Sequence, residues 1–184
     1  VFNAGVFQPV FGDDLKLDDF VKTFDVNLYG VVYSLIPLID AMKGRGRGQV
    51  ALVSSVTGYG GLPSSAAYGA TKAALINMAE SLKFDLDKMG IHIQVVNPGF
   101  VDTPATEENA FEMPALVPVE TAAQRMADGL KSSKFEITFP KRFTYSLKAL
   151  GLLPYSAYFW LLNRSTGWGK RPLGIHETGL ENDA

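Results

Sequence analysis

Short apolar runs alternate with helical segments along most of this sequence. Three runs have the length and composition of buried strands, at residues 49–53, 91–96 and 135–139. Helices are predicted at residues 20–42, 66–89 and 119–130, from apolar spacing and end signals. Gly90 follows the second helix, and Pro118 precedes the third. This alternation predicts an α/β fold with a parallel sheet and right-handed crossovers.

The composition is that of a globular domain and excludes several classes of function. The 184 residues carry a net charge of −2, and their basic residues form no single stripe, so nucleic-acid binding has no electrostatic support. Without cysteine there is no thiolate metal site, and His92 and His176 lack a metal-ligand spacing. No secretory signal opens the chain, and no run of about 18 apolar residues suggests a membrane span. We therefore expect no metal and a cytoplasmic location.

The strongest chemical signal is the combination of Ser55, Tyr68 and Lys72. Tyr68 and Lys72 are four residues apart in a predicted helix, so their side chains share one face. A positive charge near a phenol favours its ionised form and lowers its pKa. Ser55, thirteen residues before Tyr68, ends a strand-like run and offers a hydroxyl for a carbonyl oxygen. On its own the Tyr–Lys pair would be an ordinary surface pair, but the full spacing indicates a catalytic set.

This segment resembles the Ser–Tyr–Lys set of the short-chain dehydrogenase/reductase family. The resemblance implies a Rossmann-like, doubly wound parallel sheet and NAD or NADP as cofactor. It implies that Tyr68 exchanges a proton with the substrate, that Ser55 holds the substrate oxygen, and that Lys72 lowers the Tyr68 pKa and holds the nicotinamide ribose. The residue that distinguishes NAD from NADP is not identifiable in this sequence.

Two further motifs extend the resemblance to the cofactor. The segment Asn3-Ala4-Gly5 is similar to the family's strand-end motif beside the adenosine part of the cofactor. The segment Pro98-Gly99, followed by Thr103, is similar to the family segment that contacts the nicotinamide carboxamide and a nearby phosphate. Taken alone, each motif would be an ordinary turn. With Tyr68 and Lys72, these residues are the predicted cofactor site.

Asn27 is similar to the family's fourth catalytic residue. An Asn in mid-helix is mildly unfavourable and is often simply exposed. The resemblance implies instead that its side chain bridges water to Lys72, in a proton relay from Tyr68 to solvent.

The sequence departs from the family at its beginning. The glycine-rich turn that follows the family's first strand is absent, and the resemblance starts at the fourth strand and runs to about Pro140. We therefore expect the N-terminal strands, three in number with their crossovers, to precede Val1 in a complete enzyme. The expected organisation is a partial catalytic domain at residues 1–140 and a helical or irregular C-terminal extension at 141–184.

The C-terminal extension is rich in aromatic and aliphatic residues. Pro154 divides it into two short helical stretches. The favoured interpretation is a cover over the substrate cleft or a subunit contact. The alternative is contact with a membrane surface, which is less favoured because the extension has no clear basic face.

We expect an oxidoreductase that transfers a hydride between NAD(P)(H) and an apolar ketone or secondary alcohol. The loop at residues 104–117 is, by resemblance, a lid over the substrate. The predicted substrate contacts are Ser55, Leu62, Tyr68, Phe100 and Phe111. Two alternatives stay open, a non-catalytic fragment that binds no cofactor and an epimerase or dehydratase. The helices at 20–42 and 66–89 resemble those of the family's dimer, so a homodimer or homotetramer is expected.

Overall fold

A three-stranded parallel sheet forms the centre of the structure. The computed structural model describes residues 1–103, 106 and 113–174. The strands lie in the order β1 (Gly48–Val53), β2 (Ile91–Pro98) and β5 (Glu136–Phe139). Phe2 pairs in parallel with Leu52 on the other side of β1, with backbone hydrogen bonds of 2.8 and 2.9 Å. The predicted strands and their parallel arrangement are confirmed.

The register of the strands brings two candidate site segments to the same edge. Val53 at the end of β1 lies opposite Val96 of β2, and Pro98 lies opposite Phe139 of β5. The carboxyl ends of parallel strands are where open α/β sheets bind ligands. The residues that follow β1 and β2 therefore face one crevice.

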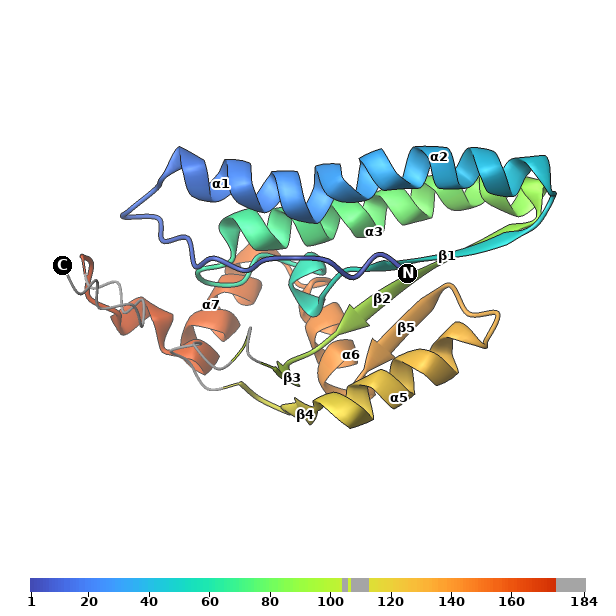
Figure 1. Cartoon of the computed structure of the whole chain (residues 1–184). Coiled ribbons are helices and arrows are strands. Elements are labelled where there is room, and N and C mark those ends of the chain that lie inside the picture. Colours follow the sequence, from blue (N-terminus) through green and yellow to red (C-terminus); the bar gives the residue numbers. More distant parts are fainter. Residues whose placement is uncertain (104–105, 107–112, 175–184) are drawn as a thin grey trace.

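Helices cover both faces of this sheet (Figure 1). On one face α2 (Gly30–Gly44) and α3 (Ala66–Leu86) pack with Val50 and Leu52 of β1 in one buried cluster. On the other, α5 (Val119–Leu130) packs over Ala51, with β2 and β5. The strand residues alternate between the two clusters because successive side chains of a strand point to opposite faces. The fold is thus Rossmann-like.

The helix predicted at 20–42 is part of a longer helical stretch in the structure, and this stretch contains an interruption that was not predicted. It begins with α1 (Leu17–Phe24) and passes through a π-helical turn, η1 (Asp25–Tyr29), into α2. The interruption surrounds Asn27, whereas α2 continues through Pro37 without a break. By length and composition the stretch Leu17–Gly44 could cross a membrane, and most of its apolar part is not buried in this structure. Its α1 and η1 segments contact α3.

The end signals of the other helices are confirmed. Gly90 follows α3 and its short extension with a left-handed φ of 71°, and Pro118 precedes α5. Pro154 separates two C-terminal helices, as predicted. The remaining elements are η2 (Val56–Gly58), η3 (Asp87–Met89), β3 (Val101–Asp102), β4 (Val117–Pro118), α6 (Lys141–Leu150), α7 (Tyr155–Thr166) and η4 (Trp168–Lys170).

Candidate active site

A cleft of about 1270 Å³ opens at the carboxyl ends of β1 and β2. Ten predicted site residues line it. They are Asn3, Gly5, Ser55, Leu62, Tyr68, Lys72, Pro98, Gly99, Phe100 and Thr103. Residues that are widely separated in sequence therefore meet in one place, as the motif spacing predicted.

Tyr68 lies on the first turns of α3, and its side chain lines the cleft together with Ser55. Burial raises the pKa of Tyr68, and the nearby Ser55 hydroxyl opposes that rise only in part. The ring of Phe7 meets the ring of Tyr68 edge-on, with centroids 5.3 Å apart, and completes an apolar wall around the phenol. At neutral pH the Tyr68 hydroxyl therefore carries its proton and can donate it.

Lys72 reaches the cleft from one helical turn further along α3. Its side chain is buried, and burial lowers the pKa of Lys72 to about 8. The ammonium nitrogen donates to the backbone oxygen of Val53 at 2.9 Å and lies 5.3 Å from the centroid of the Tyr68 ring. An ammonium has three donors, so others can serve a ligand in the cleft. Burial is the largest influence on the pKa of Tyr68, and the lowering expected from Lys72 stays a prediction.

Asn27 lies behind the cleft and is fully buried. Its side-chain oxygen accepts from the Val6 N–H at 2.7 Å, and its side-chain nitrogen donates to the Val6 carbonyl at 2.9 Å. A side chain on Gly5 would come within 3.3 Å of Asn27 Oδ1 and 3.5 Å of Lys72 Nζ. Asn27 thus holds the chain after Gly5 against η1, and its amide nitrogen also donates to Thr71 Oγ1 of α3 at 3.4 Å. The predicted water relay from Lys72 remains a prediction.

A polar network holds the loops that carry the site residues. The carboxylate of Glu136 accepts from Tyr59 Oη and from Asn97 Nδ2, each at 2.7 Å, and pairs with Lys148 of α6. Burial alone would raise the pKa of Glu136, but these three donors together keep it below its usual value. The network connects the loop after Ser55, the end of β2, and α6.

Three predicted residues or segments need separate mention. Ala4 is exposed, although its neighbours Asn3 and Gly5 line the cleft. Phe111 lies outside the described residues, as does most of the predicted lid at 104–117. Of that lid, Met113 and Pro114 line the cleft, and Thr106 donates to the Val101 carbonyl at 2.6 Å.

The C-terminal helices supply cleft residues that the sequence analysis did not assign to the site. They are Phe143, Ser146 and Leu147 of α6, and Leu162, Ser165, Thr166, Gly167, Trp168 and Arg171 from α7 onwards. The available signal was the aromatic composition of this extension, which favoured a cover without specifying which side chains face inward. These helices therefore border the cleft, and the prediction of a cover or a subunit contact stays a prediction.

The cleft has the donor set needed at the nicotinamide end of a dinucleotide. Tyr68 and Lys72 offer a hydroxyl and an ammonium side by side, with Thr103 on the loop after β2. At Gly99 an added side chain would come within 3.0 Å of the Phe143 ring, and at Gly5 it would fill the space next to Lys72. At both glycines the near neighbours are protein side chains, so the absence of a side chain lets these two segments pack closely at the wall of the cleft. The residues present fit such a cofactor.

Comparison with known proteins shows one consistent relationship. The family described as short chain dehydrogenase matches residues 1–113. An uncharacterized oxidoreductase of Myxococcus xanthus is 33% identical over 154 residues, covering 84% of this chain and 61% of that protein. The 3-dehydrosphinganine reductase TSC10B of Arabidopsis thaliana is 31% identical over 175 residues, covering 88% of this chain and 53% of that protein. The chain thus spans little more than half the length of these relatives.

Solved structures support the same fold. A short chain dehydrogenase from Burkholderia cenocepacia, crystallised with NADP, has a TM-score of 0.76 at 21% identity, covering 87% of this chain and 66% of that one. A short-chain dehydrogenase from Streptomyces avermitilis has a TM-score of 0.67 at 20% identity, covering 92% and 70%. Together with the match over residues 1–113 and the arrangement of Ser55, Tyr68 and Lys72, these findings show that the chain belongs to the short-chain dehydrogenase family.

Proposed function

We propose that the protein containing this chain is an NAD(P)-dependent oxidoreductase that interconverts an apolar ketone and a secondary alcohol. The observation that carries the proposal is the meeting of Ser55, Tyr68 and Lys72 at the wall of one cleft, with the Tyr68 pKa raised by burial and the Lys72 ammonium beside the Tyr68 ring. The apolar lining around it, with Leu62, Phe100 and the C-terminal helices, supports an apolar substrate.

In the reductive direction the cofactor, when bound, supplies the hydride. Tyr68 donates its proton to the carbonyl oxygen, and Ser55 donates a hydrogen bond to the same oxygen and fixes its position. Lys72 holds the cofactor ribose through donors not used by Val53 and keeps a positive charge beside the phenolate that forms. Acid–base help of this kind contributes roughly 10²–10⁴-fold in rate.

The test is to incubate the intact purified protein with NADH or NADPH and a series of ketones of increasing apolar size, following nicotinamide absorbance. We expect oxidation of one cofactor that depends on the ketone. Turnover of a sugar nucleotide or hydroxyacyl substrate without any net nicotinamide change would instead indicate an epimerase or dehydratase and would contradict the proposal.

We also propose a cytoplasmic homodimer, or a dimer of dimers, formed through α2 and α3. Large apolar side chains are exposed on these helices, among them Tyr33 and Ile36 of α2 and Phe84 of α3. A face of this kind, repeated by a two-fold axis, gives a self-complementary interface. The cytoplasmic location rests on the sequence alone.

A further inference from the structure

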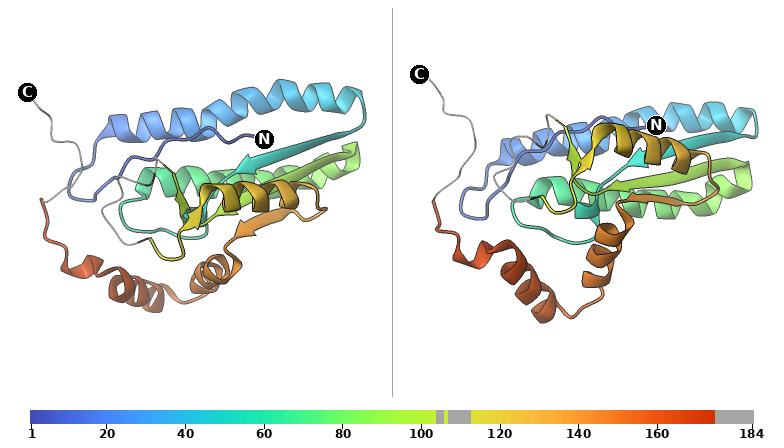
Figure 2. Two further views of the ribbon diagram at one scale, coloured as in Figure 1. Left: turned by 60° about the horizontal axis from the view of Figure 1, so that its bottom comes forward. Right: turned by 90° about the horizontal axis from the view of Figure 1, so that it is seen from below.

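The connection between α6 and α7 is an apolar projection on the surface of the protein. We define the hairpin tip as Leu152, Leu153, Pro154 and Tyr155. All four are exposed, Leu152 at 87% and Tyr155 at 79% of their full surface. Figure 2 shows that α6 and α7 form a V whose vertex, in orange-red, points away from the sheet in both views. A soluble protein rarely leaves such a group in water without a binding role.

Helix α7 continues this apolar surface on its outer side. The helix buries Tyr158 and Leu162, which are one turn apart, against the body of the protein. The residues around the rest of the helix are exposed, including Phe159 and Trp160. The Phe159 ring stacks on Tyr155 of the tip, with centroids 6.0 Å apart. The tip and the outer side of α7 therefore form one continuous aromatic and aliphatic surface.

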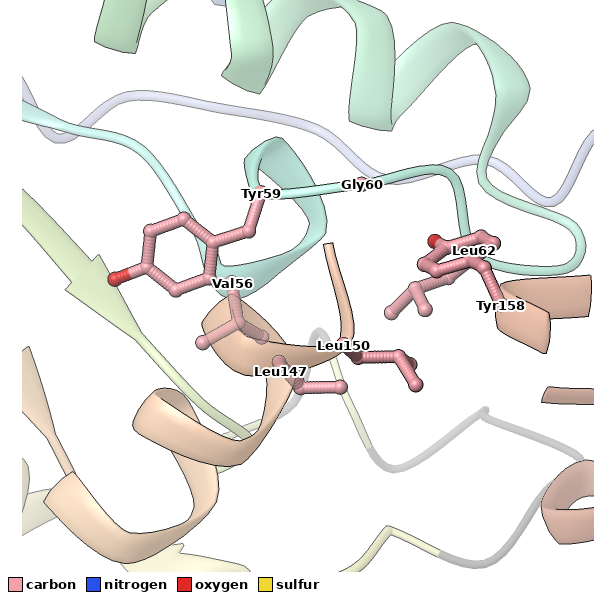
Figure 3. Close-up of a pocket in the computed structure, with 7 residues that line it drawn as sticks. All are labelled: Val56, Tyr59, Gly60, Leu62, Leu147, Leu150 and Tyr158. Atoms are coloured by element: carbon pink, nitrogen blue, oxygen red, sulfur yellow. The ribbon is translucent and has the colours of Figure 1, made fainter. Parts of the chain in front are cut away.

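The hairpin is fixed to the body of the protein. Tyr158 donates from its hydroxyl to the Gly61 carbonyl at 2.7 Å, and Thr144 of α6 is fully buried. In Figure 3, Tyr158 and Leu150 converge with Leu62 around a cavity of only about 10 Å³. Lys148 adds its ion pair with Glu136. The exposed tip is thus presented on a packed support.

The charged residues of the α6–α7 hairpin and its flanking segments are all basic. Residues 137–176 contain no Asp or Glu, while Lys and Arg occur six times, at 141, 142, 148, 164, 170 and 171. Lys148 and Arg171 pair with acidic residues from other parts of the chain, Glu136 and Asp13. Lys141 and Arg142 are exposed at the start of α6, and Arg164 is exposed near the end of α7, where it lies over the Trp160 ring at 5.9 Å. The apolar tip thus lies between exposed positive charges at the far ends of both helices.

The inner side of the same hairpin lines the cleft. Leu162 and the residues that follow it to Trp168 border the cleft, as do Phe143 and Leu147 of α6. An apolar molecule held at the outer surface of the hairpin would therefore be one helix diameter from the candidate active site.

From these observations we propose that the α6–α7 hairpin docks this protein on an anionic lipid surface. The tip and the Phe159–Trp160 side enter the interfacial region, and Lys141, Arg142 and Arg164 contact lipid headgroups. Tyr and Trp suit the boundary between headgroups and acyl chains, and each Lys or Arg near such a surface adds attraction. A protein partner is less well matched, because the tip is a convex projection and its flanking charges are all positive.

The test is flotation of the intact protein with lipid vesicles, one set of pure phosphatidylcholine and one containing roughly a third phosphatidylserine. We expect binding to the anionic vesicles that weakens with added salt, because surface electrostatics are screened. The double variant Leu152→Ser/Tyr155→Ser should lower the partition coefficient at least tenfold, given the apolar surface that each side chain buries. The variant Lys141→Glu/Arg142→Glu should lower it by a similar factor on anionic vesicles only.

Two matched controls separate docking from general effects. Leu15→Ser removes an exposed leucine from the loop before α1, and Lys43→Glu/Arg45→Glu makes the same charge change at the far end of α2. Both should bind vesicles as the unchanged protein does, and all variants should keep its circular dichroism and melting temperature. Equal losses in control and tip variants, or no binding to either vesicle, would overturn the proposal. So would self-association that depends on the tip in the absence of lipid. Because the readout is vesicle binding, it is independent of whether the proposed oxidoreductase activity is found.

Discussion

Replacing Lys72 by Met should stabilise the cofactor-free protein while it removes a group needed for function. The two side chains have similar length and volume, so the change mainly removes a buried charge. Lys72 is 3% exposed, and its pKa is lowered by burial from 10.5 to about 8. At 1.36 kcal/mol per pKa unit, the buried ammonium costs about 3 kcal/mol of folding free energy at neutral pH.

Two contributions to the folding free energy oppose each other in the Lys72→Met variant. The loss of the hydrogen bond to the Val53 carbonyl costs roughly 1–3 kcal/mol if that oxygen stays dry. The variant should therefore be about 0–2 kcal/mol more stable than the unchanged protein at pH 7. The sharper prediction concerns pH, because the Met side chain does not titrate and the two proteins share every other group.

The sign follows from the lowered pKa of Lys72. Below pH 8, Lys72 is charged in both the folded and the unfolded state, so the full cost of burying the ammonium applies. Between pH 8 and 10.5 only the unfolded state keeps the proton, so the free energy of unfolding of the unchanged protein rises with pH. The stability of the unchanged protein relative to Lys72→Met should thus rise by about 3 kcal/mol from pH 7 to 10.5. Urea unfolding at a series of pH values measures this difference, with Lys43→Met, an exposed substitution on α2, as control. A difference that stays constant over this range would refute the reasoning.

Three further predictions test the scaffold. Asn27→Ala should lower the free energy of unfolding by about 2–4 kcal/mol in urea, because the N–H and carbonyl of Val6 both lose their partner; a loss under 0.5 kcal/mol would contradict this role. Gly90→Ala should cost more than Gly167→Ala by at least about 1 kcal/mol. Both have left-handed φ, but only at Gly90 would the added carbon meet backbone, Gly46 O at 2.4 Å; equal melting temperatures would speak against it. The folded protein should scatter light as a dimer or tetramer at micromolar concentration, and a monomer would contradict the interface proposed for α2 and α3.

Local patterns predicted the strands and helices well because each is fixed by its own residues. The strand at 91–96 is dominated by the β-branched residues Ile91, Ile93, Val95 and Val96. The helix after Tyr68 ends at Gly90, because glycine readily takes the left-handed conformation found there. The spacing of Ser55, Tyr68 and Lys72 predicted that they lie close together for the same reason. The end of one strand and one face of one helix are enough to bring them together.

Features that depend on tertiary contacts could not be predicted in this way. The π-helical turn at Asn27 has no local sequence signal, since it positions the side chain toward Val6, twenty-one residues away. The raised pKa of Tyr68 could not be predicted from the spacing, because its largest cause is burial, which depends on the tertiary structure. The placement of Lys141, Arg142 and Arg164 at exposed positions on α6 and α7 could not be predicted, because these residues form no continuous stripe in the sequence.

The central claim is that Tyr68 is the proton donor and acceptor of the reaction, and one comparison tests it directly. Tyr68→Phe and Tyr59→Phe each remove one hydroxyl from a partly buried tyrosine near the end of β1, but only Tyr68 lines the large cleft. We predict that kcat/KM for ketone reduction by the intact protein falls roughly 10²–10⁴-fold in Tyr68→Phe. In Tyr59→Phe, which loses a bond to Glu136, it should change by less than about threefold while the melting temperature drops. Turnover by a folded Tyr68→Phe protein at the rate of the unchanged protein would contradict the account.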